Sequence, residues 1–237
     1  MLVDRGFFES RERAKRAVMA GQVLMDDCPA NKPGQQVRQD AAIQLKAQDP
    51  FVSRGGLKLD HAIQHFDLDV QNVIAADLGA STGGFTDCLL QRGVSKVYAV
   101  DVGQGQLAWK LRTDERVVVM EKTNARHLRK NQLPETVSLI VVDCSFISLK
   151  HILPPAVDLL EPNGRIIALI KPQFEAGKEE ADKGRGVIRD PLIHQSILKS
   201  LELFATSELP LKWKGLVESP IQGPAGNKEF LVWLEKY

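Results

Sequence analysis

The 237-residue sequence lacks long apolar runs and has few cysteines. No run approaches the roughly 18 residues of a membrane-spanning helix, and the first residues lack the charged-then-apolar order of a signal peptide. The three cysteines, Cys28, Cys88 and Cys144, are widely spaced and form no Cys-x-x-Cys pair. The sequence therefore indicates neither a zinc site nor a disulfide framework, no metal is expected, and a reducing cytoplasm is favoured.

An excess of positive charge is also missing. The formal net charge is +1, whereas nucleic-acid-binding proteins are often more basic. Any RNA-binding surface must therefore come from a local arrangement of lysines and arginines. Hydrophobic residues make up 43% and charged residues 26% of the chain, which is ordinary for a soluble globular protein.

The chain divides into a short first part and a longer second part. Residues 1–47 predict a small unit made of a helix followed by short strands. Residues 48–52 are predicted to be a linker, because Pro50 disfavours helix at the residue before it. Over residues 53–237, short apolar runs alternate with helical patterns. This alternation predicts an α/β domain whose parallel sheet is covered on both faces.

Seven apolar runs of the second part are predicted to be strands, over residues 73–76, 97–102, 117–120, 139–142, 165–170, 211–218 and 230–234. Helices are expected over residues 57–66, 85–92, 106–112, 149–160 and 190–204. Since the last two strands have no helix between them, they should form an antiparallel hairpin at one edge of the sheet.

A glycine-rich turn follows the first strand, with the sequence Asp77-Leu78-Gly79-Ala80-Ser81-Thr82-Gly83-Gly84-Phe85. Its glycines allow a tight turn and the close approach of a ligand, although a generic turn between strand and helix is the alternative. The spacing is not Gly-x-Gly-x-x-Gly and the strand ends in an acid, which suits a cationic ligand such as S-adenosylmethionine better than a dinucleotide. The predicted cofactor-binding residues here are Asp77, Gly79, Ser81, Thr82, Gly83 and Phe85.

Further polar residues follow the next strands. Asp101, Asn124 and Asp143 come after the second, third and fourth strands, and the carboxyl ends of parallel strands share one edge of the sheet. A carboxylate such as that of Asp101 can accept hydrogen bonds from both ribose hydroxyls of an adenosine. Aspartates are also common turn residues, but their number at one edge favours a cofactor site. Phe85 and Trp109 either stack on a base there or pack in the core.

Two lysines and two acids form a candidate catalytic group. Lys171 and Asp143 follow strands whose ends are expected to be neighbours, Lys58 begins a helix, and Glu229 begins the last strand. Methylation of a hydroxyl requires removal of its proton, and a second cation, a helix N-terminus and burial all favour a neutral amine that accepts one. We expect Lys171 to be the base and Lys58 to position the ribose; the alternative is that both lysines are solvated.

Together these motifs resemble the TlyA (haemolysin A-like) family. The resemblance is carried by Ser53-Arg54-Gly55-Gly56-Leu57-Lys58-Leu59, Asp77 to Asp87, Asp101 to Trp109, Thr123 to Arg126, Asp143 to Leu149, Lys171-Pro172-Gln173-Phe174-Glu175 and Gly223 to Phe230. It implies a seven-stranded, Rossmann-like class I methyltransferase domain of the FtsJ type over residues 53–237. It also implies an S4-like RNA-binding domain over residues 1–47, expected to be shortened because the chain begins later than such a module usually does.

The resemblance further implies a reaction and its partners. The reaction is 2′-O-methylation of ribosomal RNA, at cytidine, with S-adenosylmethionine as the cofactor. The Lys-Asp-Lys-Glu tetrad of FtsJ-like enzymes falls on Lys58, Asp143, Lys171 and Glu229, the four residues chosen above. Ribosomal RNA or ribosomal subunits are the expected partners, and no membrane is involved.

Exposed basic residues are the candidates for RNA contact. Arg11 and Lys15 are four residues apart and share a helix face, from which they can reach phosphates; a solvated helix with charge pairs is the alternative. The charged, glycine-rich stretch 175–186 is either a mobile surface loop or a lid over the substrate. The predicted RNA-binding residues are Arg11, Lys15, Arg54, Lys178, Lys183 and Arg185.

Three other functions compete with this prediction. The protein could be a ribosome assembly factor that keeps the fold without the chemistry, although all four tetrad positions are present. It could be a membrane-active haemolysin, as the family's historical name suggests. It could also methylate a base or a protein, but the Asp143-Cys144-Ser145-Phe146 segment lacks the prolines of an amino-methyltransferase motif.

Overall fold

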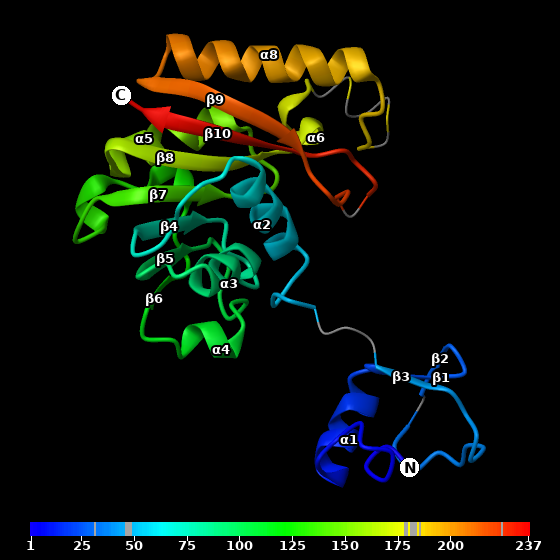
Figure 1. Ribbon diagram of the computed structural model, residues 1–237. Helices are drawn as coiled ribbons and strands as arrows, with labels where there is room; N and C mark the ends of the chain where they lie inside the picture. The colour runs from blue at the N-terminus through cyan, green and yellow to red at the C-terminus, as the bar shows by residue number, and fades with distance from the viewer. Residues whose placement is uncertain (31, 46–48, 178–179, 181–183, 185, 224) are drawn as a thin grey trace. The chain divides into compact units, whose positions relative to one another are not determined.

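The computed structural model describes residues 1–30, 32–45, 49–177, 180, 184, 186–223 and 225–237. The chain forms two compact units, Met1–Asp49 and Pro50–Tyr237, and each is described by itself (Figure 1). None of the helices described has the length and apolar character needed to cross a membrane.

The first unit packs one helix against a small antiparallel sheet of order β2-β1-β3. Its elements are α1 (Arg11–Met19), β1 (Val23–Met25), β2 (Cys28–Pro29) and β3 (Ile43–Leu45). Ser10 caps α1, because its hydroxyl accepts a hydrogen bond from the Arg13 N–H. Ala17, Val18 and Val23 form the core, so the opposite face of α1 is left to solvent.

The second unit is built on a seven-stranded sheet of order β6-β5-β4-β7-β8-β10-β9. Its strands are β4 (Ile74–Leu78), β5 (Lys96–Val100), β6 (Val117–Met120), β7 (Val137–Val142), β8 (Leu160–Ile170), β9 (Leu211–Glu218) and β10 (Phe230–Lys236). The first five strands in this order run parallel, while β10 is antiparallel to both β8 and β9. The predicted seven-stranded α/β fold with a hairpin at one edge is thereby confirmed.

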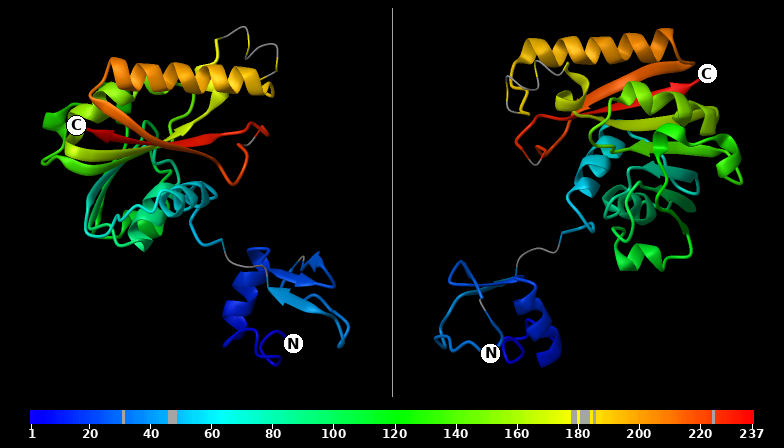
Figure 2. Two further views of the ribbon diagram at one scale, coloured as in Figure 1. Left: turned by 45° about the horizontal axis from the view of Figure 1, so that its top comes forward. Right: turned by 180° about the vertical axis from the view of Figure 1, so that it is seen from behind.

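Helices cover both faces of this sheet (Figure 2). They are α2 (Gly55–His65), α3 (Gly84–Gln91), α4 (Trp109–Arg112), α5 (Leu153–Leu159), α6 (Pro172–Glu175) and α8 (Pro191–Ser207), with 3-10 turns η1 (Ala125–His127), η2 (Lys130–Gln132) and η3 (Leu149–His151). Leu139 and Val141 of β7 pack with α2 and α3, whereas Ile140 and Val142 pack with α5 and α8. The alternation of a strand thus supplies two separate apolar cores.

Three of the five expected helices differ from the structure by one to three residues at their ends, and the other two begin at least three residues later than expected. The helix expected from residue 106 begins at Trp109, because the Ala108 N–H donates to Thr82 O and holds the preceding residues along the glycine-rich turn. The helix expected over residues 149–160 is divided into η3 and α5. Prolines at the start of α5 explain the division, since they fit only the first turn of a helix.

Gly56 generates a prediction about stability. A Cβ atom at this position would lie 2.3 Å from Cγ of the buried Phe51 side chain. We expect Gly56→Ala to displace the ring and lower the free energy of unfolding by about 1–3 kcal/mol, measured by urea denaturation. The control is Gly177→Ala, since no atom of the described residues lies within 4 Å of a Cβ there. Equal stability of the two variants would contradict the prediction.

Candidate functional site

The glycine-rich turn is held tightly between its neighbours. Gly79 and Gly83 have φ angles of +92° and +95°, values that favour glycine. A Cβ at Gly79 would come within 2.8 Å of Asp143 O, and one at Gly83 within 2.2 Å of Leu111 Cδ1. Both glycines therefore serve the backbone conformation and the close packing of the turn against β7 and α4.

A pocket of about 510 Å³ opens beside this turn at the carboxyl ends of the parallel strands. Gly79, Ser81, Asp101, Asn124 and Asp143 all contribute to its lining. The Asp101 carboxylate accepts hydrogen bonds from the backbone N–H groups of Ser81, at 2.8 Å, and Gly103, at 2.7 Å. These bonds fix the carboxylate at the rim and leave each oxygen a further lone pair for a ligand hydroxyl.

Asp77 lies behind the turn and is fully buried. Its Oδ2 accepts hydrogen bonds from the Thr86 N–H, at 2.9 Å, and the Thr86 hydroxyl, at 2.7 Å. Its Oδ1 is buried with no hydrogen-bond partner among the residues described. Burial raises the pKa of Asp77 to about 7, and the nearby Asp143 charge adds to the rise. Asp77 thus braces the start of α3 and does not line either pocket at this edge.

A second pocket of about 280 Å³ shares Gly79, Ser81 and Asp143 with the first. Lys58 and Lys171 both line it. Because each of these lysines is only 8% exposed, the alternative that they are solvated surface residues is wrong. The two predicted amines therefore lie at one pocket, although they come from distant parts of the sequence.

Each lysine is paired with one predicted acid. Lys58 Nζ lies 2.5 Å from Glu229 Oε2, and Lys171 Nζ lies 2.6 Å from Asp143 Oδ1. The second amine also donates a hydrogen bond of 2.8 Å to the hydroxyl of Ser145. Buried charges require such partners, so these pairs fix both amines at the wall of the pocket.

The sheet register explains how Glu229 reaches this group. Phe230 of β10 is paired with Ile170 of β8, so the residues just beyond this pair, Glu229 and Lys171, lie at the same end of the two strands. Glu229 is 1% exposed and is not among the residues that line the pocket. It therefore acts on the pocket through Lys58.

Sequence reasoning did not select two residues that the structure places at the site. Ser145 lines both pockets and accepts the Lys171 hydrogen bond. Phe146 lines the first pocket, is 90% exposed and has a φ of +63°, which is rare for a bulky residue. The available signal was their position two and three residues after Asp143, the predicted strand-end acid.

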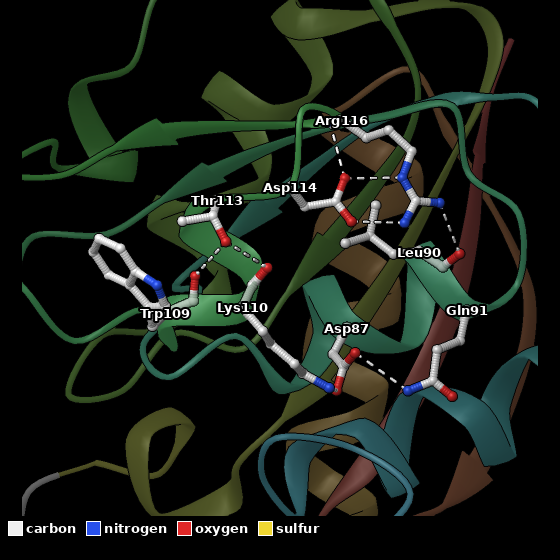
Figure 3. A network of polar contacts seen from close by, with 8 residues as sticks. All are labelled: Asp87, Leu90, Gln91, Trp109, Lys110, Thr113, Asp114 and Arg116. Carbon is white, nitrogen blue, oxygen red and sulfur yellow. Dashed lines mark hydrogen bonds and ion pairs between the residues drawn. The ribbon is translucent and has the colours of Figure 1, made fainter.

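The two predicted aromatic residues have different environments. Phe85 is 3% exposed, belongs to the core and also lines the second pocket. Trp109 is 75% exposed, so core packing is the wrong interpretation for this residue. Figure 3 shows the polar contacts beside it, where the Lys110 ammonium lies 2.9 Å from Asp87 Oδ2 and joins α4 to α3. This contact holds the two helices that flank Gly83.

The predicted RNA-binding residues lie in both units. Arg54 is exposed at the rim of the second pocket, directly before α2. Arg11 and Lys15 are exposed on α1 and line a hollow of about 360 Å³ within the first unit. Lys178, Lys183 and Arg185 lie outside the described residues.

The site fits S-adenosylmethionine. The larger pocket offers acceptor oxygens on Asp101 and Asn124, which suit the hydroxyls of an adenosine. Asp77 Oδ1, which has no hydrogen-bond partner among the described residues, lies behind the turn. The lysine-lined pocket adjoins the larger pocket. Carboxylates at the strand ends suit a cationic cofactor, and the neighbouring pocket lined by two lysine amines suits a substrate that must lose a hydroxyl proton.

Comparison with known proteins identifies the family. The model of the FtsJ-like methyltransferase family matches residues 51–236. The chain belongs to this family. It is 43% identical to the 16S/23S rRNA (cytidine-2′-O)-methyltransferase TlyA of Mycobacterium tuberculosis over 98% of this chain and 87% of that protein. It is 48% identical to YqxC of Bacillus subtilis over 99% of this chain and 83% of that protein.

Solved structures agree with this assignment. A Streptococcus thermophilus protein with a hemolysin name is 46% identical and superposes with a TM-score of 0.79, over 99% of this chain and 86% of that one. The N-methyltransferase NodS of Bradyrhizobium japonicum, solved with S-adenosyl-L-homocysteine, is 16% identical with a TM-score of 0.51, over 75% of this chain and 85% of that one. This second likeness shows the fold alone. The predicted resemblance to the TlyA proteins and to the FtsJ-like methyltransferase domain is confirmed, while the S4-like character of the first unit stays a prediction.

The buried Asp77 generates a prediction about pH. Because its folded pKa of about 7 lies above the ordinary value of 3.8, the folded state binds a proton more tightly than the unfolded chain. The contribution of Asp77 therefore lowers stability as the pH rises from about 4 to about 7. Asp77→Asn keeps an oxygen for Thr86 and removes this dependence. Between pH 5 and pH 8, the melting temperature of the variant should rise relative to that of the parent as the pH increases. A constant difference between the two melting temperatures would contradict the prediction.

Proposed function

We propose that this protein transfers a methyl group from S-adenosylmethionine to a ribose 2′-hydroxyl of ribosomal RNA, at a cytidine. The observation that carries the proposal is the pair of buried lysine–carboxylate contacts, Lys58 with Glu229 and Lys171 with Asp143, beside the pocket at the strand ends. The name of the M. tuberculosis relative, an rRNA (cytidine-2′-O)-methyltransferase, supports the choice of substrate.

In this proposal one lysine removes the proton of the ribose 2′-hydroxyl and the other positions its oxygen. When bound, S-adenosylmethionine supplies an electrophilic methyl group on its sulfonium. As the neutral amine, Lys171 would accept the proton of the 2′-hydroxyl while that oxygen forms its bond to the methyl carbon; the carbon–sulfur bond would break and the sulfur would leave as a neutral thioether. Asp143 and Ser145 orient the Lys171 amine through the contacts described above. Lys58, held by Glu229, positions the ribose oxygen. The proposed catalytic residues are Lys58, Asp143, Lys171 and Glu229.

The first pocket is proposed to hold the cofactor. Asp101 would accept the ribose hydroxyls of the adenosine, since its carboxylate is fixed at the pocket rim by two backbone N–H groups. The other proposed binding residues are those of the turn and the adjoining strand ends, Asp77, Gly79, Ser81, Thr82, Gly83, Phe85, Asn124 and Asp143. Asp77 would contribute indirectly, by holding the turn and the start of α3 from behind, since it is buried and does not line the pocket.

RNA is proposed to enter over the second pocket. Arg54 is exposed at its rim and can contact a phosphate. Phe146 is almost fully exposed beside the first pocket, and an exposed aromatic ring next to a ribose site can stack on an unpaired base. Ribosomal subunits are the proposed partners, which places the reaction in the cytoplasm.

The first unit is proposed to be an S4-like RNA-binding domain. Arg11 and Lys15 are exposed on one face of α1, while Ala14, Ala17 and Val18 of the same helix are buried. This amphipathic division leaves the basic side chains available for phosphates. The domain boundary is proposed to lie near residues 48–52, close to the division between the two compact units.

The other functions receive less support. A non-catalytic assembly factor would have no use for two lysines that are 8% exposed and paired with acids, because burying charges is costly. Methylation of a base amine requires no such pairs. The name Hemolysin A belongs to a Brachyspira hyodysenteriae relative that is 40% identical, but the pockets described here suit a methyltransferase.

Lys171 provides the main catalytic prediction. Lys171→Met should lower the rate of methyl transfer to ribosomal subunits by about 100-fold or more, because the variant lacks the proposed base. The dissociation constant for S-adenosylmethionine, measured by isothermal titration calorimetry, should stay unchanged. Lys214→Met on the edge strand β9 is the matched control and should keep full activity. The proposal is wrong if the Lys171 variant turns over like the parent.

The first unit provides a prediction about RNA affinity. Replacing Arg11 and Lys15 together by glutamine should weaken binding to ribosomal RNA through lost phosphate contacts. The slope of the logarithm of the binding constant against the logarithm of salt concentration should shrink by roughly 2, one for each contact. Filter binding at several salt concentrations measures the slope. An unchanged slope would show that α1 does not contact phosphates.

A further inference from the structure

Asn227 is one of the most deeply buried polar residues, with 1% of its surface exposed. It belongs to the loop between β9 and β10 and precedes Glu229 by two positions. Its side-chain amide donates a hydrogen bond of 2.8 Å to Gly186 O and accepts one of 2.9 Å from the Ile188 N–H. The nitrogen and the oxygen of the Asn227 amide therefore both form hydrogen bonds with a segment about 40 positions earlier in the chain.

The segment that Asn227 holds has no regular structure of its own at residues 187–190. It lies between α6, which follows Lys171 directly, and α8. On the α8 side, the His194 ring contacts Ile188 O through Nε2 at 3.0 Å, and the Ile188 side chain is buried. Asn227 therefore ties the chain that continues from Lys171 to the loop that leads into Glu229.

The same loop fixes the Glu229 carboxylate closely. Asn227 O accepts a hydrogen bond of 3.0 Å from the Gly223 N–H, and Glu229 O accepts one of 2.8 Å from the Ser219 N–H. A Cβ atom at Gly223 would lie 2.5 Å from Glu229 Oε1. The loop at Gly223 is therefore packed against the carboxylate that contacts Lys58, and a shift of Gly223 toward it would displace it.

We infer that Asn227 is a positioning residue, which sets the Glu229 carboxylate, and through it the Lys58 amine, against the Lys171 side of the pocket. The inference rests on the proposed function, because it assigns the loop a role in the same methyl transfer. Loss of the side-chain amide would free the loop from residues 186–188 and loosen the Lys58–Glu229 pair. Cofactor binding would be spared, since the larger pocket is formed by the other strand ends.

The first experiment measures kcat and KM of Asn227→Ala with tritiated S-adenosylmethionine and purified ribosomal subunits. We expect kcat to fall by about 10- to 100-fold, because a misplaced catalytic group has this effect, with the cofactor dissociation constant unchanged. Asn227→Asp is measured in parallel, since it keeps the shape and the oxygen facing Ile188 but removes the donor to Gly186. It should show the same kind of loss even if the alanine variant folds poorly.

A double-mutant cycle tests whether Asn227 acts through Glu229. In a Glu229→Ala background, adding Asn227→Ala should lower kcat by less than about twofold further, because nothing is left to position. If the double variant lowers kcat by the product of the two single-variant factors, the inference is overturned. Tyr98→Phe is the control for a side-chain hydrogen bond lost from another strand, since its hydroxyl donates to Glu135 in a partly buried contact, and it should keep the parent kcat.

The outcomes separate the two proposals. If the parent enzyme methylates no ribosomal subunit, the proposed function fails. If the parent is active but both Asn227 variants match its kcat, or lose only affinity for the cofactor, the positioning role alone fails.

Discussion

The buried contact between Lys58 and Glu229 is the constraint on which the site depends. It joins residues that are 171 positions apart in the chain, one at the start of α2 and the other at the start of β10. An ammonium and a carboxylate that are almost without solvent are stable only when each has its partner in place. The first helix and the last strand of the second unit must therefore dock correctly before either charge is accommodated.

The sheet supplies the second half of this arrangement. Because β10 enters between β8 and β9 in the opposite direction, its first residues meet the last residues of β8. Asp143 and Lys171 follow the parallel neighbours β7 and β8. The four candidate catalytic groups are thus gathered at one edge by strand order and register, while the glycine-rich turn lines the adjoining pocket.

Burial divides the acids of this edge into two kinds. Asp101 keeps lone pairs at the rim of a pocket, where it can meet a ligand. Asp77 lies beneath the turn, where burial raises its pKa to about 7 and Thr86 occupies one of its oxygens. The polar rim therefore offers acceptors of the kind that an adenosine would need, whereas the buried acid braces the helix that begins after the turn.

The sequence by itself determined the α/β class and the seven strands, because apolar runs of strand length follow directly from sheet geometry. It also singled out Lys58, Asp143, Lys171 and Glu229 as candidates, and the structure brings these four residues together. Helix bounds were less predictable, since the interruptions before α4 and α5 depend on the hydrogen bond of Ala108 to Thr82 and on prolines at a helix start. The placement of the strand-end residues at one edge followed from the pattern.

Only the tertiary structure decided how those residues are used. Packing buries Asp77 and leaves Trp109 exposed. It also brings Ser145 within hydrogen-bond distance of Lys171, and it lets Asn227 form hydrogen bonds with Gly186 and Ile188. Such contacts link residues far apart in the chain, and burial is a property of the packed molecule. The order of residues in the chain shows which side chains are present and which of them follow a strand. It does not show which residues will surround each side chain in the folded molecule.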